Sequence, residues 1–244
     1  MNIIIHGAAG RMGRMVEEKT RETVVALVDP NTPAGSGEHC YAALTDYTGP
    51  ADVVIDFSHH SAVGALLDYC TGRTLPVVVA TTGHTAEEKE KIAAAAGRVP
   101  VFYSANMSVG VAVLAGLALR AAAAFPEADI EIIETHHNQK LDVPSGTALL
   151  LADAIREARK DAVLLIGRHE NGKRTAREIG IHSVRLGGEV GTHEILISTG
   201  SETITLKHQA HSRALFAEGA LRAAAFLAGK PAGLYSMKDI AEGE

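Results

Sequence analysis

The glycine-rich turn after the first apolar run is the feature that most constrains this chain. Residues 2–6 (Asn-Ile-Ile-Ile-His) form a short, β-branched run, which predicts a strand buried between layers of helices. The turn reads Gly7-Ala8-Ala9-Gly10-Arg11-Met12-Gly13, and a helical pattern continues to about Thr20. Glycines allow the backbone to approach a pyrophosphate, and the helix start offers free N–H donors. This order predicts the opening of a dinucleotide-binding parallel sheet.

The next hundred residues repeat the alternation of short apolar strands with helices. Strands are expected at residues 24–28, 53–57, 76–80 and 99–103, and helices at about 61–69 and 85–96. Thr85 and Glu88 have the spacing of a capping box at the start of the second helix. Regular alternation of this kind predicts an α/β fold, a Rossmann-like, doubly wound parallel sheet.

The pattern changes after residue 107. A long Ala-rich helix (108–124) and an alternating strand (129–136) precede a helix that Ser145 caps and that runs to about Arg159. Strand-like runs then follow near 162–166, 179–186 and 193–208, with polar turns such as Gly200-Ser201. Strands grouped in this way predict a second α+β domain built on a mixed sheet. We therefore expect one domain at 1–107 plus 214–244, completed by a final helix (214–228), and a second at 108–213.

An acid stands at the end of the second expected strand. Asp29 lies 16 positions after Gly13, close to where a carboxylate would accept hydrogen bonds from ribose hydroxyls. A carboxylate repels a 2′-phosphate, and no Arg follows Asp29 directly, so we expect NADH to be preferred to NADPH. Arg11 or Arg14 could still offer a phosphate partner. The alternative is an ordinary tight turn beside a surface Asp.

The densest cluster of reactive side chains lies at residues 134–147. His136, His137 and Lys140 fall within five positions, ahead of a glycine-containing helix start. His donates protons near neutral pH, Lys offers a compact cation, and a helix start suits an anion such as a carboxylate. A metal site is not expected, because adjacent strand residues point to opposite faces and the lysine repels a cation. A solvated polar loop is the plain alternative.

Two further polar segments follow strands of the first domain. Thr81-Thr82-Gly83 follows the fourth strand and Ser104-Ala105-Asn106-Met107 follows the fifth. Ligands bind at the carboxyl ends of strands in open α/β sheets. The first segment is equally well explained as a turn leading into the Thr85 cap.

Charge and cysteine content exclude some functions. Lys and Arg number 23 against 29 for Asp and Glu, which gives a formal net charge of −6. Nucleic-acid and anionic-membrane binders need a broad basic field, so neither partner is expected. Cys40 and Cys70 form no disulfide framework and no CxxC spacing, and we expect both reduced, in the cytoplasm. No secretory signal or membrane span is expected.

These motifs resemble the dihydrodipicolinate reductase (4-hydroxy-tetrahydrodipicolinate reductase) family. The most specific match is Glu134-x-His136-His137-x-x-Lys140-x-Asp142-x-Pro144-Ser145-Gly146-Thr147, and the turn from Gly7 to Arg14 resembles the family's nucleotide loop. Further matches are Asp56-Phe57-Ser58, Thr81-Thr82-Gly83, Ser104-Ala105-Asn106-Met107-Ser108, Ser183-Val184-Arg185, Val190-Gly191-x-His193-Glu194 and Gly229-Lys230-x-x-Gly233-Leu234-Tyr235-x-Met237. Ala9 and Ala80 replace glycines common in the family.

The resemblance implies an oxidoreductase of lysine and diaminopimelate biosynthesis. NAD(P)H would reduce a cyclic imine dicarboxylate to tetrahydrodipicolinate, with His136 as proton donor and Lys140 as second donor. The substrate would contact His137, Lys140, Ser145, Gly146, Thr147 and Thr82. The cofactor would contact Gly7, Ala8, Ala9, Gly10, Arg11, Met12, Asp29, Ala80, Thr81, Thr82, Ala105, Asn106 and Met107. The second domain would bind substrate and assemble a homotetramer.

Two other functions stay open on the residues alone. One is another NAD(P)-dependent amino-acid dehydrogenase, and the other is a non-catalytic module that senses NAD. Neither gives a reason for the cluster at residues 134–147.

Overall fold

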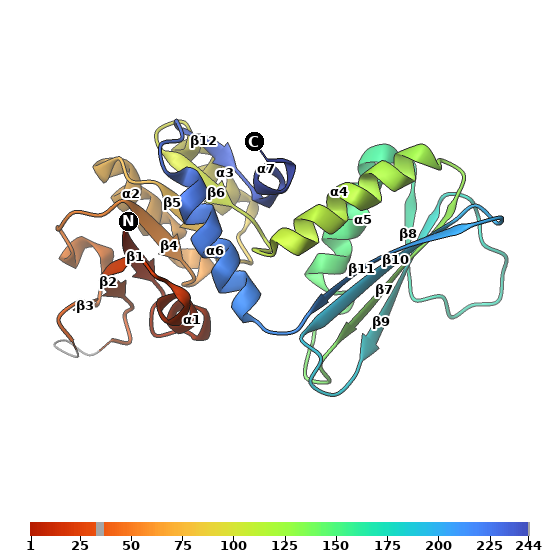
Figure 1. The fold of residues 1–244 in the computed structure, drawn as a ribbon, viewed down its shortest axis with the longest axis horizontal. Helices are drawn as coiled ribbons and strands as arrows, with labels where there is room; N and C mark the ends of the chain where they lie inside the picture. The colour runs from red at the N-terminus through yellow and green to blue at the C-terminus, as the bar shows by residue number, and fades with distance from the viewer. Residues whose placement is uncertain (33–36, 244) are drawn as a thin grey trace. The chain divides into compact units, whose positions relative to one another are not determined.

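A computed structural model describes residues 1–32 and 37–243 of the chain. It divides into two compact units, which are treated separately below. The first contains Met1–Val109 and the segment from Ala214 onward, and the second contains Gly110–Arg213 (Figure 1). None of the described helices is long and apolar enough to cross a membrane.

The first unit is built on a seven-stranded sheet with all neighbours parallel. Its spatial order is β12-β6-β5-β4-β1-β2-β3. The strands are β1 (Asn2–His6), β2 (Thr23–Val28), β3 (Cys40–Tyr41), β4 (Val53–Asp56), β5 (Val77–Val79), β6 (Pro100–Tyr103) and β12 (Gly233–Tyr235). The chain extends the sheet one way from β1 and then the other way from β4, so β1 and β4 meet at the topological switch point.

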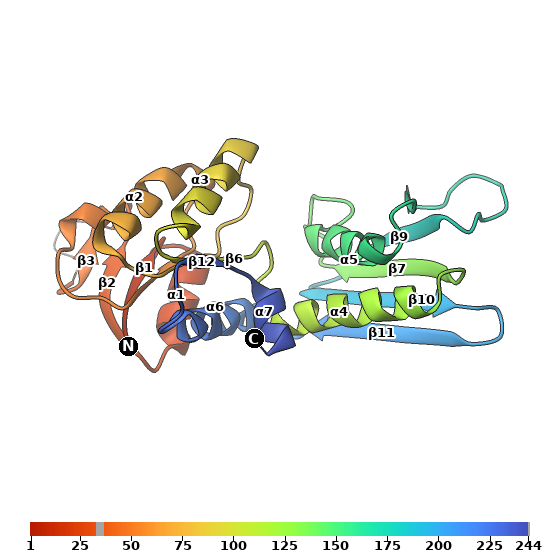
Figure 2. The same ribbon diagram turned by 90° about the horizontal axis from the view of Figure 1, so that it is seen from above.

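Helices cover both faces of this sheet. They are α1 (Arg11–Lys19), α2 (Val63–Arg73), α3 (Ala86–Ala96), α6 (Ala214–Leu227) and α7 (Met237–Glu242), with short 3₁₀ turns at Leu44–Asp46 and His60–Ala62. The pair α2 and α3 packs on one face and the pair α1 and α6 on the other (Figure 2). Ile3, Ile4 and Ile5 are fully buried, as a strand between two helix layers requires. The doubly wound sheet predicted from the sequence is confirmed.

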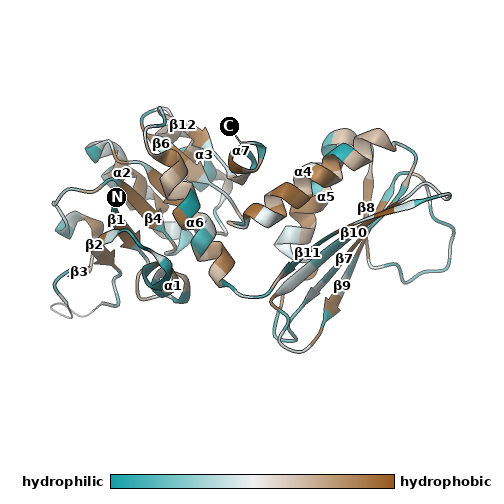
Figure 3. Cartoon of the chain, in the orientation of Figure 1, coloured by the Kyte–Doolittle hydropathy of each residue, from teal (hydrophilic) through white to brown (hydrophobic). Residues whose placement is uncertain are grey.

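The second unit is a mixed five-stranded sheet with two helices on one face (Figure 2). Its strands are β7 (Asp129–His136), β8 (Val163–Ile166), β9 (Glu178–Arg185), β10 (Gly191–Ser198) and β11 (Thr203–Ala210), and its helices are α4 (Val109–Ala124) and α5 (Gly146–Ala158). The order is β11-β10-β7-β9-β8, with β7, β8 and β9 parallel and β10 antiparallel to both its neighbours. In Figure 3, α4 is hydrophobic over most of its length, whereas α1 is mostly hydrophilic.

Strand β7 alternates strictly between the two faces of its sheet. Ile130 and Ile132 join the core formed with α4 and α5, and Glu134 and His136 continue on that same face. Glu131 points to the opposite face. The strand therefore carries one glutamate on each side.

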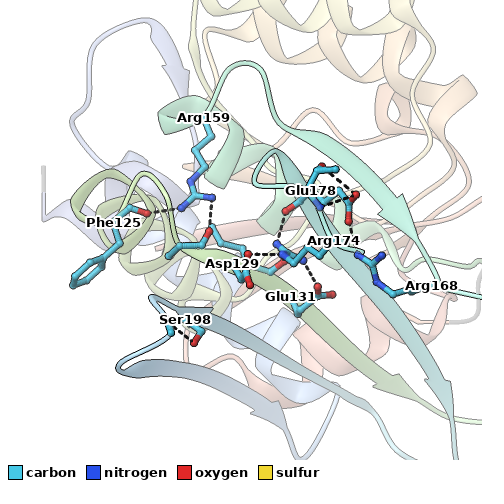
Figure 4. A network of polar contacts seen from close by, with 12 residues as sticks. Phe125, Asp129, Glu131, Arg159, Arg168, Arg174, Glu178 and Ser198 are labelled. Carbon is cyan, nitrogen blue, oxygen red and sulfur yellow. Dashed lines mark hydrogen bonds and ion pairs between the residues drawn. The ribbon is translucent and has the colours of Figure 1, made fainter. Parts of the chain in front are cut away.

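A polar network ties the segment before β9 to this sheet (Figure 4). Arg174 donates to Asp129 Oδ1 at 2.6 Å, to Glu131, and to the carbonyl oxygens of Ile130 at 3.1 Å and Glu178 at 2.6 Å. Close to this network, Arg159 donates to the carbonyl oxygens of Phe125 and Ala128, which directly precede β7. Both arginines therefore fasten the backbone at the start of β7.

Most expected elements are observed, and the differences have local causes. The helix expected at 61–69 begins as a 3₁₀ turn and continues to Arg73, where Thr74 ends it in the left-handed conformation at φ 55°. The run 193–208 is two strands, because the chain reverses at residues 199–202. The capping box is present, since Thr85 Oγ accepts the Glu88 N–H at 3.2 Å and Glu88 accepts the Thr85 N–H at 2.8 Å.

Candidate active site

The glycine turn after β1 needs at least two of its three glycines. Gly7 has φ +82°, and a Cβ there would lie 2.5 Å from the Phe57 carbonyl oxygen. A Cβ at Gly13 would lie 2.3 Å from the Gly7 carbonyl oxygen. Gly10 precedes α1 and contributes no side-chain cap. Arg11, the first residue of the helix, is exposed. The turn therefore presents backbone donors and exposed cations to an anion.

Asp29 is buried at the end of β2 and holds this turn. One carboxylate oxygen accepts the Ala9 N–H at 3.2 Å and the other accepts the Asn31 N–H at 2.9 Å. Its position at the carboxyl edge beside the glycine turn is the one expected for a ribose-binding acid.

A second buried acid lies at the same edge of the sheet. Asp56 ends β4, is 1% exposed, and lies 2.8 Å from His6 Nδ1 at the end of β1. It also accepts the Thr81 hydroxyl at 2.6 Å, directly after β5. Thr82, the next residue, is exposed. Asp56 therefore anchors the loop that carries Thr82, a role that its sequence motif does not predict.

Hydrogen bonds from its own side chains stabilise the segment after β6. The Ser104 hydroxyl donates to the Asn106 carbonyl oxygen at 2.7 Å, and the Asn106 side chain accepts the Ser108 N–H at 2.8 Å. Met107 is buried at 3% exposure. The residues predicted for the cofactor thus follow β1, β2, β5 and β6, whose carboxyl ends share one edge of the sheet.

The chemistry of the second unit centres on Glu134, whose side chain is fully buried. It accepts the Ser145 N–H at 3.2 Å and both terminal nitrogens of Arg185 at 3.0 Å. His136 Nδ1 lies 2.5 Å from Glu134 Oε2. Burial acts to raise the pKa of Glu134, but the hydrogen bonds from His136 and Arg185 outweigh it and lower that pKa to about 2. Glu134 is therefore a carboxylate at every pH relevant to a cell.

Strand register explains why these groups meet. His193 pairs with Glu134 across β10 and β7, and Arg185 pairs with His136 across β9 and β7. The His136 and His193 rings meet edge to face, with centroids 5.1 Å apart. Burial, with some help from nearby His136, lowers the pKa of His193 to about 4, so its imidazole is neutral near pH 7.

Ser145 lies at the junction of this cluster with α5. Its hydroxyl oxygen accepts the Ala148 N–H at 3.2 Å and lies 3.2 Å from His193 Nε2. The predicted N-cap is therefore present. Ser145 is 1% exposed, and its contacts are all within the unit, so it aligns the helix start that Gly146 and Thr147 form.

Lys140 and His137 lie in the loop between β7 and α5. Lys140 Nζ is 2.8 Å from Asp142 Oδ1. Burial acts to raise the pKa of Asp142, while Lys140 and the Gly146 backbone N–H lower it, and the net shift is downward. His137 Nε2 lies 3.3 Å from the Arg213 guanidinium, and both border an open hollow together with His211. No cluster of metal-ligating side chains occurs among residues 1–32 and 37–243.

The sequence predicts no role for His6, and it matches Glu134, Arg185 and Asp56 to the family without giving them a role. For His193 it leaves two interpretations open, a structural residue or one that lines the cleft. The available signal is an acid on the apolar face of an alternating strand, since a buried charge needs a partner. The partner itself could not be read from the sequence, because Arg185 lies 51 positions away.

The fold and these two sets of residues define a class. A doubly wound sheet with a glycine turn, together with a separate sheet that carries a buried acid–base cluster, is typical of oxidoreductases that use a nicotinamide dinucleotide.

Comparison with known proteins identifies the family. Residues 1–107 match the family model described as "Dihydrodipicolinate reductase, N-terminus" and residues 110–241 match "Dihydrodipicolinate reductase, C-terminus". A 4-hydroxy-tetrahydrodipicolinate reductase from Caldanaerobacter subterraneus is 44% identical, over 98% of this chain and 98% of that one. One from Clostridium novyi is 42% identical, over 98% and 97%. The chain belongs to the dihydrodipicolinate reductase family and is an oxidoreductase, as its motifs predicted.

A solved structure agrees with this assignment. The dihydrodipicolinate reductase from Paenisporosarcina sp. TG-14, whose structure is described as dipicolinate-bound, superposes with a TM-score of 0.83 and 28% identity. The match covers 98% of this chain and 99% of that one. Similarity of this extent across both units favours the reductase over the two other functions left open by the sequence.

Proposed function

We propose that this chain reduces the substrate for which its relatives are named, 4-hydroxy-tetrahydrodipicolinate, in the diaminopimelate route to lysine. The observation that carries the proposal is the cluster of Glu134, His136 and Lys140 at the start of α5, inside a chain of this family. A buried carboxylate, an imidazole and a cation beside a helix start are suited to binding and protonating an anion.

We assign residues 1–107 and 214–244, which belong to the first unit, to binding the dinucleotide. The bound NAD(P)H would supply a hydride, which is two electrons and one hydrogen nucleus. Gly7, Ala8, Ala9, Gly10, Arg11, Met12, Asp29, Ala80, Thr81, Thr82, Ala105, Asn106 and Met107 would hold it. Support comes from the glycine contacts and from the common edge at which these segments end.

Cofactor preference is proposed to favour NADH over NADPH. Asp29 lies at the end of β2 with its carboxylate buried beside the glycine turn, and a carboxylate there repels a 2′-phosphate. Comparing kcat/KM for NADH and NADPH tests this. A clear preference for NADPH would show that exposed Arg11 or Arg14 outweighs Asp29.

We assign residues 108–213, nearly all of which form the second unit, to substrate binding and assembly. His137, Lys140, Gly146 and Thr147 would bind the two carboxylates, with Ser145 aligning the helix start. One carboxylate, that of Asp142, already lies against Lys140 and the Gly146 N–H, which supports the idea that a substrate carboxylate can take its place.

His136 is proposed to protonate the ring. Hydride addition to a conjugated imine pushes one electron pair onto a ring atom, and one proton must arrive to neutralise it. That proton would leave His136 Nε2, and its bond electrons would stay on the nitrogen. Lys140 would be the second donor. The 4-hydroxyl group of the substrate would leave as water together with one ring hydrogen, which gives the conjugated imine. That imine would gain two hydrogens, one as hydride and one as a proton, and the dinucleotide would leave in its oxidised form.

A homotetramer in the cytoplasm is proposed from the family resemblance. One observation supports the tetramer. Because α4 and α5 lie on the same face of the second sheet, no described helix covers its other face. Light scattering coupled to gel filtration tests the tetramer, and a monomer at micromolar concentration would contradict it.

A coupled assay tests the proposed function most directly. The unstable substrate is generated enzymatically in the cuvette, and loss of the absorbance of NADH or NADPH is followed. We expect oxidation that depends on substrate and stops without the coupling enzyme. Turnover with simple amino or keto acids instead would favour an amino-acid dehydrogenase, and no turnover with dinucleotide binding intact would favour a sensing module.

A further inference from the structure

Glu134 and His136 form a pair inside the sheet. They are two positions apart on β7 and so share one face, with Glu134 fully buried and His136 exposed by only 8%. The His136 Nδ1 atom faces the carboxylate at 2.5 Å. Its Nε2 atom lies at Gly191, where an added Cβ would come within 3.0 Å of it.

The charge state of Glu134 decides which nitrogen of His136 carries a fixed proton. An ionised carboxylate only accepts hydrogen bonds, and Glu134 accepts them from Arg185 and from the Ser145 N–H as well. The contact at Nδ1 is therefore an N–H donating to Glu134. Only Nε2 is left to lose and regain a proton.

We infer that Glu134 is the positioning residue for the proton donor: it fixes His136 with Nδ1–H toward the sheet, so that Nε2 delivers the proton. Arg185 holds Glu134 in place with two hydrogen bonds to its carboxylate. The same carboxylate accepts the N-cap Ser145 N–H, so one side chain aligns both the proton donor and the helix start. This inference rests on the proposed function.

Other charged and titratable groups near His136 come from several elements. Arg185 lies on β9 and His193 on β10, and His137 and Lys140 follow in the loop after β7. Among the hydrogen bonds of the described residues, Glu134 is the only acceptor for the His136 ring.

The chain carries a matched control for this arrangement. Glu131, three positions earlier on β7, accepts from His182 Nε2 at 2.8 Å and from Arg174. It therefore has the same types of partner as Glu134, on the opposite face of the sheet. The hydrogen bonds of Glu131 to described residues include none to a residue proposed to bind substrate or dinucleotide.

The test compares Glu134→Gln with Glu131→Gln. For Glu134→Gln we expect kcat to fall about 100-fold or more with KM changed by less than about threefold, because the amide no longer fixes the tautomer. For Glu131→Gln we expect kcat within about threefold of wild type. Nitrogen-15 NMR of the imidazoles should show Nδ1–H as the sole neutral tautomer of His136 in wild type and in Glu131→Gln, but a mixture in Glu134→Gln.

A pH profile separates positioning from simple damage. Glu134→Gln removes the negative charge beside the proposed proton donor, so the alkaline limb of kcat/KM should move to lower pH in this variant. It should not move in Glu131→Gln. Wild-type kcat in folded Glu134→Gln, or a fall in kcat with an unchanged tautomer and pH profile, would overturn the inference.

A second variant guards against loss of folding. If Arg185 is left unpaired and Glu134→Gln does not melt cooperatively, the double variant Glu134→Gln, Arg185→Met removes both charges. It should show the same loss of kcat, and wild-type turnover in it would overturn the inference. Absence of turnover by the wild-type protein in the coupled assay would instead contradict the proposed function.

Discussion

Two glutamates on one strand, Glu131 and Glu134, gather the same kinds of partner on opposite faces of the second sheet. Glu134 pairs with His136 and Arg185, and Glu131 pairs with His182 and Arg174. The Glu134 side chain is 0% exposed, whereas that of Glu131 is 27% exposed. The residue types alone therefore do not make a catalytic site.

The two glutamates differ in the segments of the chain that lie beside them. Beside Glu134 lie the start of α5, through Ser145, and the loop that carries Lys140. Beside Glu131 lies the segment before β9, which Arg174 fastens to the sheet (Figure 4). Gly180 leaves room for this second pair, since an added Cβ would overlap the Glu131 carboxylate. The first cluster is the one proposed to bind a ligand, whereas the second holds segments of the sheet together.

The largest difference in kcat should appear between two lysine variants, one at Lys140 near the Glu134 cluster and one at Lys207 on the Glu131 face. Lys140→Met should lower kcat by about 10²–10³-fold, because it takes away a proposed substrate cation and proton donor. Lys207→Met removes the lysine that pairs with Glu194 at 3.7 Å and should leave kcat within about threefold of wild type. Steady-state kinetics on both variants measures this. Equal losses would break the distinction between the faces.

The arginines should differ in what they contribute to stability. Arg185→Met leaves the buried Glu134 carboxylate without its two-point partner and should cost about 3–5 kcal/mol of unfolding free energy. Arg174→Met leaves a carboxylate that water can reach and should cost about 1–2 kcal/mol. Urea unfolding followed by far-ultraviolet circular dichroism gives both values. A larger cost for Arg174→Met would reverse the comparison.

Acid should destabilise the Glu134 face in two separate pH windows. His193 has a pKa of about 4 when folded and 6.5 as its ordinary value, so between these only the unfolded chain gains a proton. Unfolding free energy should therefore fall by on the order of 2–3 kcal/mol as the pH drops through this window.

A variant at His193 isolates that first window. His193→Gln keeps an acceptor for Ser145 but cannot titrate, so its stability should fall less than that of wild type in this window. Below pH 4.5, both proteins should lose stability toward pH 2 as the paired Glu134 is protonated. Chemical unfolding at a series of pH values tests both parts, and identical curves for the two proteins would contradict the role given to His193.

The smallest effect should come from the rim of the Glu131 face. Arg168 pairs with Glu178, and their side chains are 31% and 16% exposed. Arg168→Gln should cost less than about 1 kcal/mol, and the difference should shrink in about 1 M salt because the pair is screened. A cost above about 2 kcal/mol would mean that this pair is part of the core rather than the rim.

Local signals explain what the sequence predicted well. The β-branched run at 2–6, the Thr85–Glu88 capping box and the Ser145 cap are each set within a few residues, and each is observed. The two-residue strand β3 (Cys40–Tyr41) was not predicted, because a pair of residues has no periodicity to read.

Contacts between distant residues explain what was missed. Glu131 and Glu134 look alike in sequence. Alternation along β7 places them on opposite faces, but only contacts with β9 and the segment before it bring Arg185 and Arg174 to them. The Asp56–His6 contact likewise joins residues 50 positions apart through the parallel pairing of β1 and β4. The sequence could therefore name the cluster at 134–147 but not the side chains that hold it.

The most direct test of the central claim compares the two histidines. His136→Gln removes the imidazole that contacts Glu134, and His182→Gln removes the imidazole that contacts Glu131. For both variants, kcat is measured with saturating substrate and dinucleotide. We expect His136→Gln to lose about 10²–10⁴-fold in kcat and His182→Gln to stay within about threefold of wild type. Near-normal turnover in His136→Gln, or an equal loss in His182→Gln, would contradict the role proposed for His136.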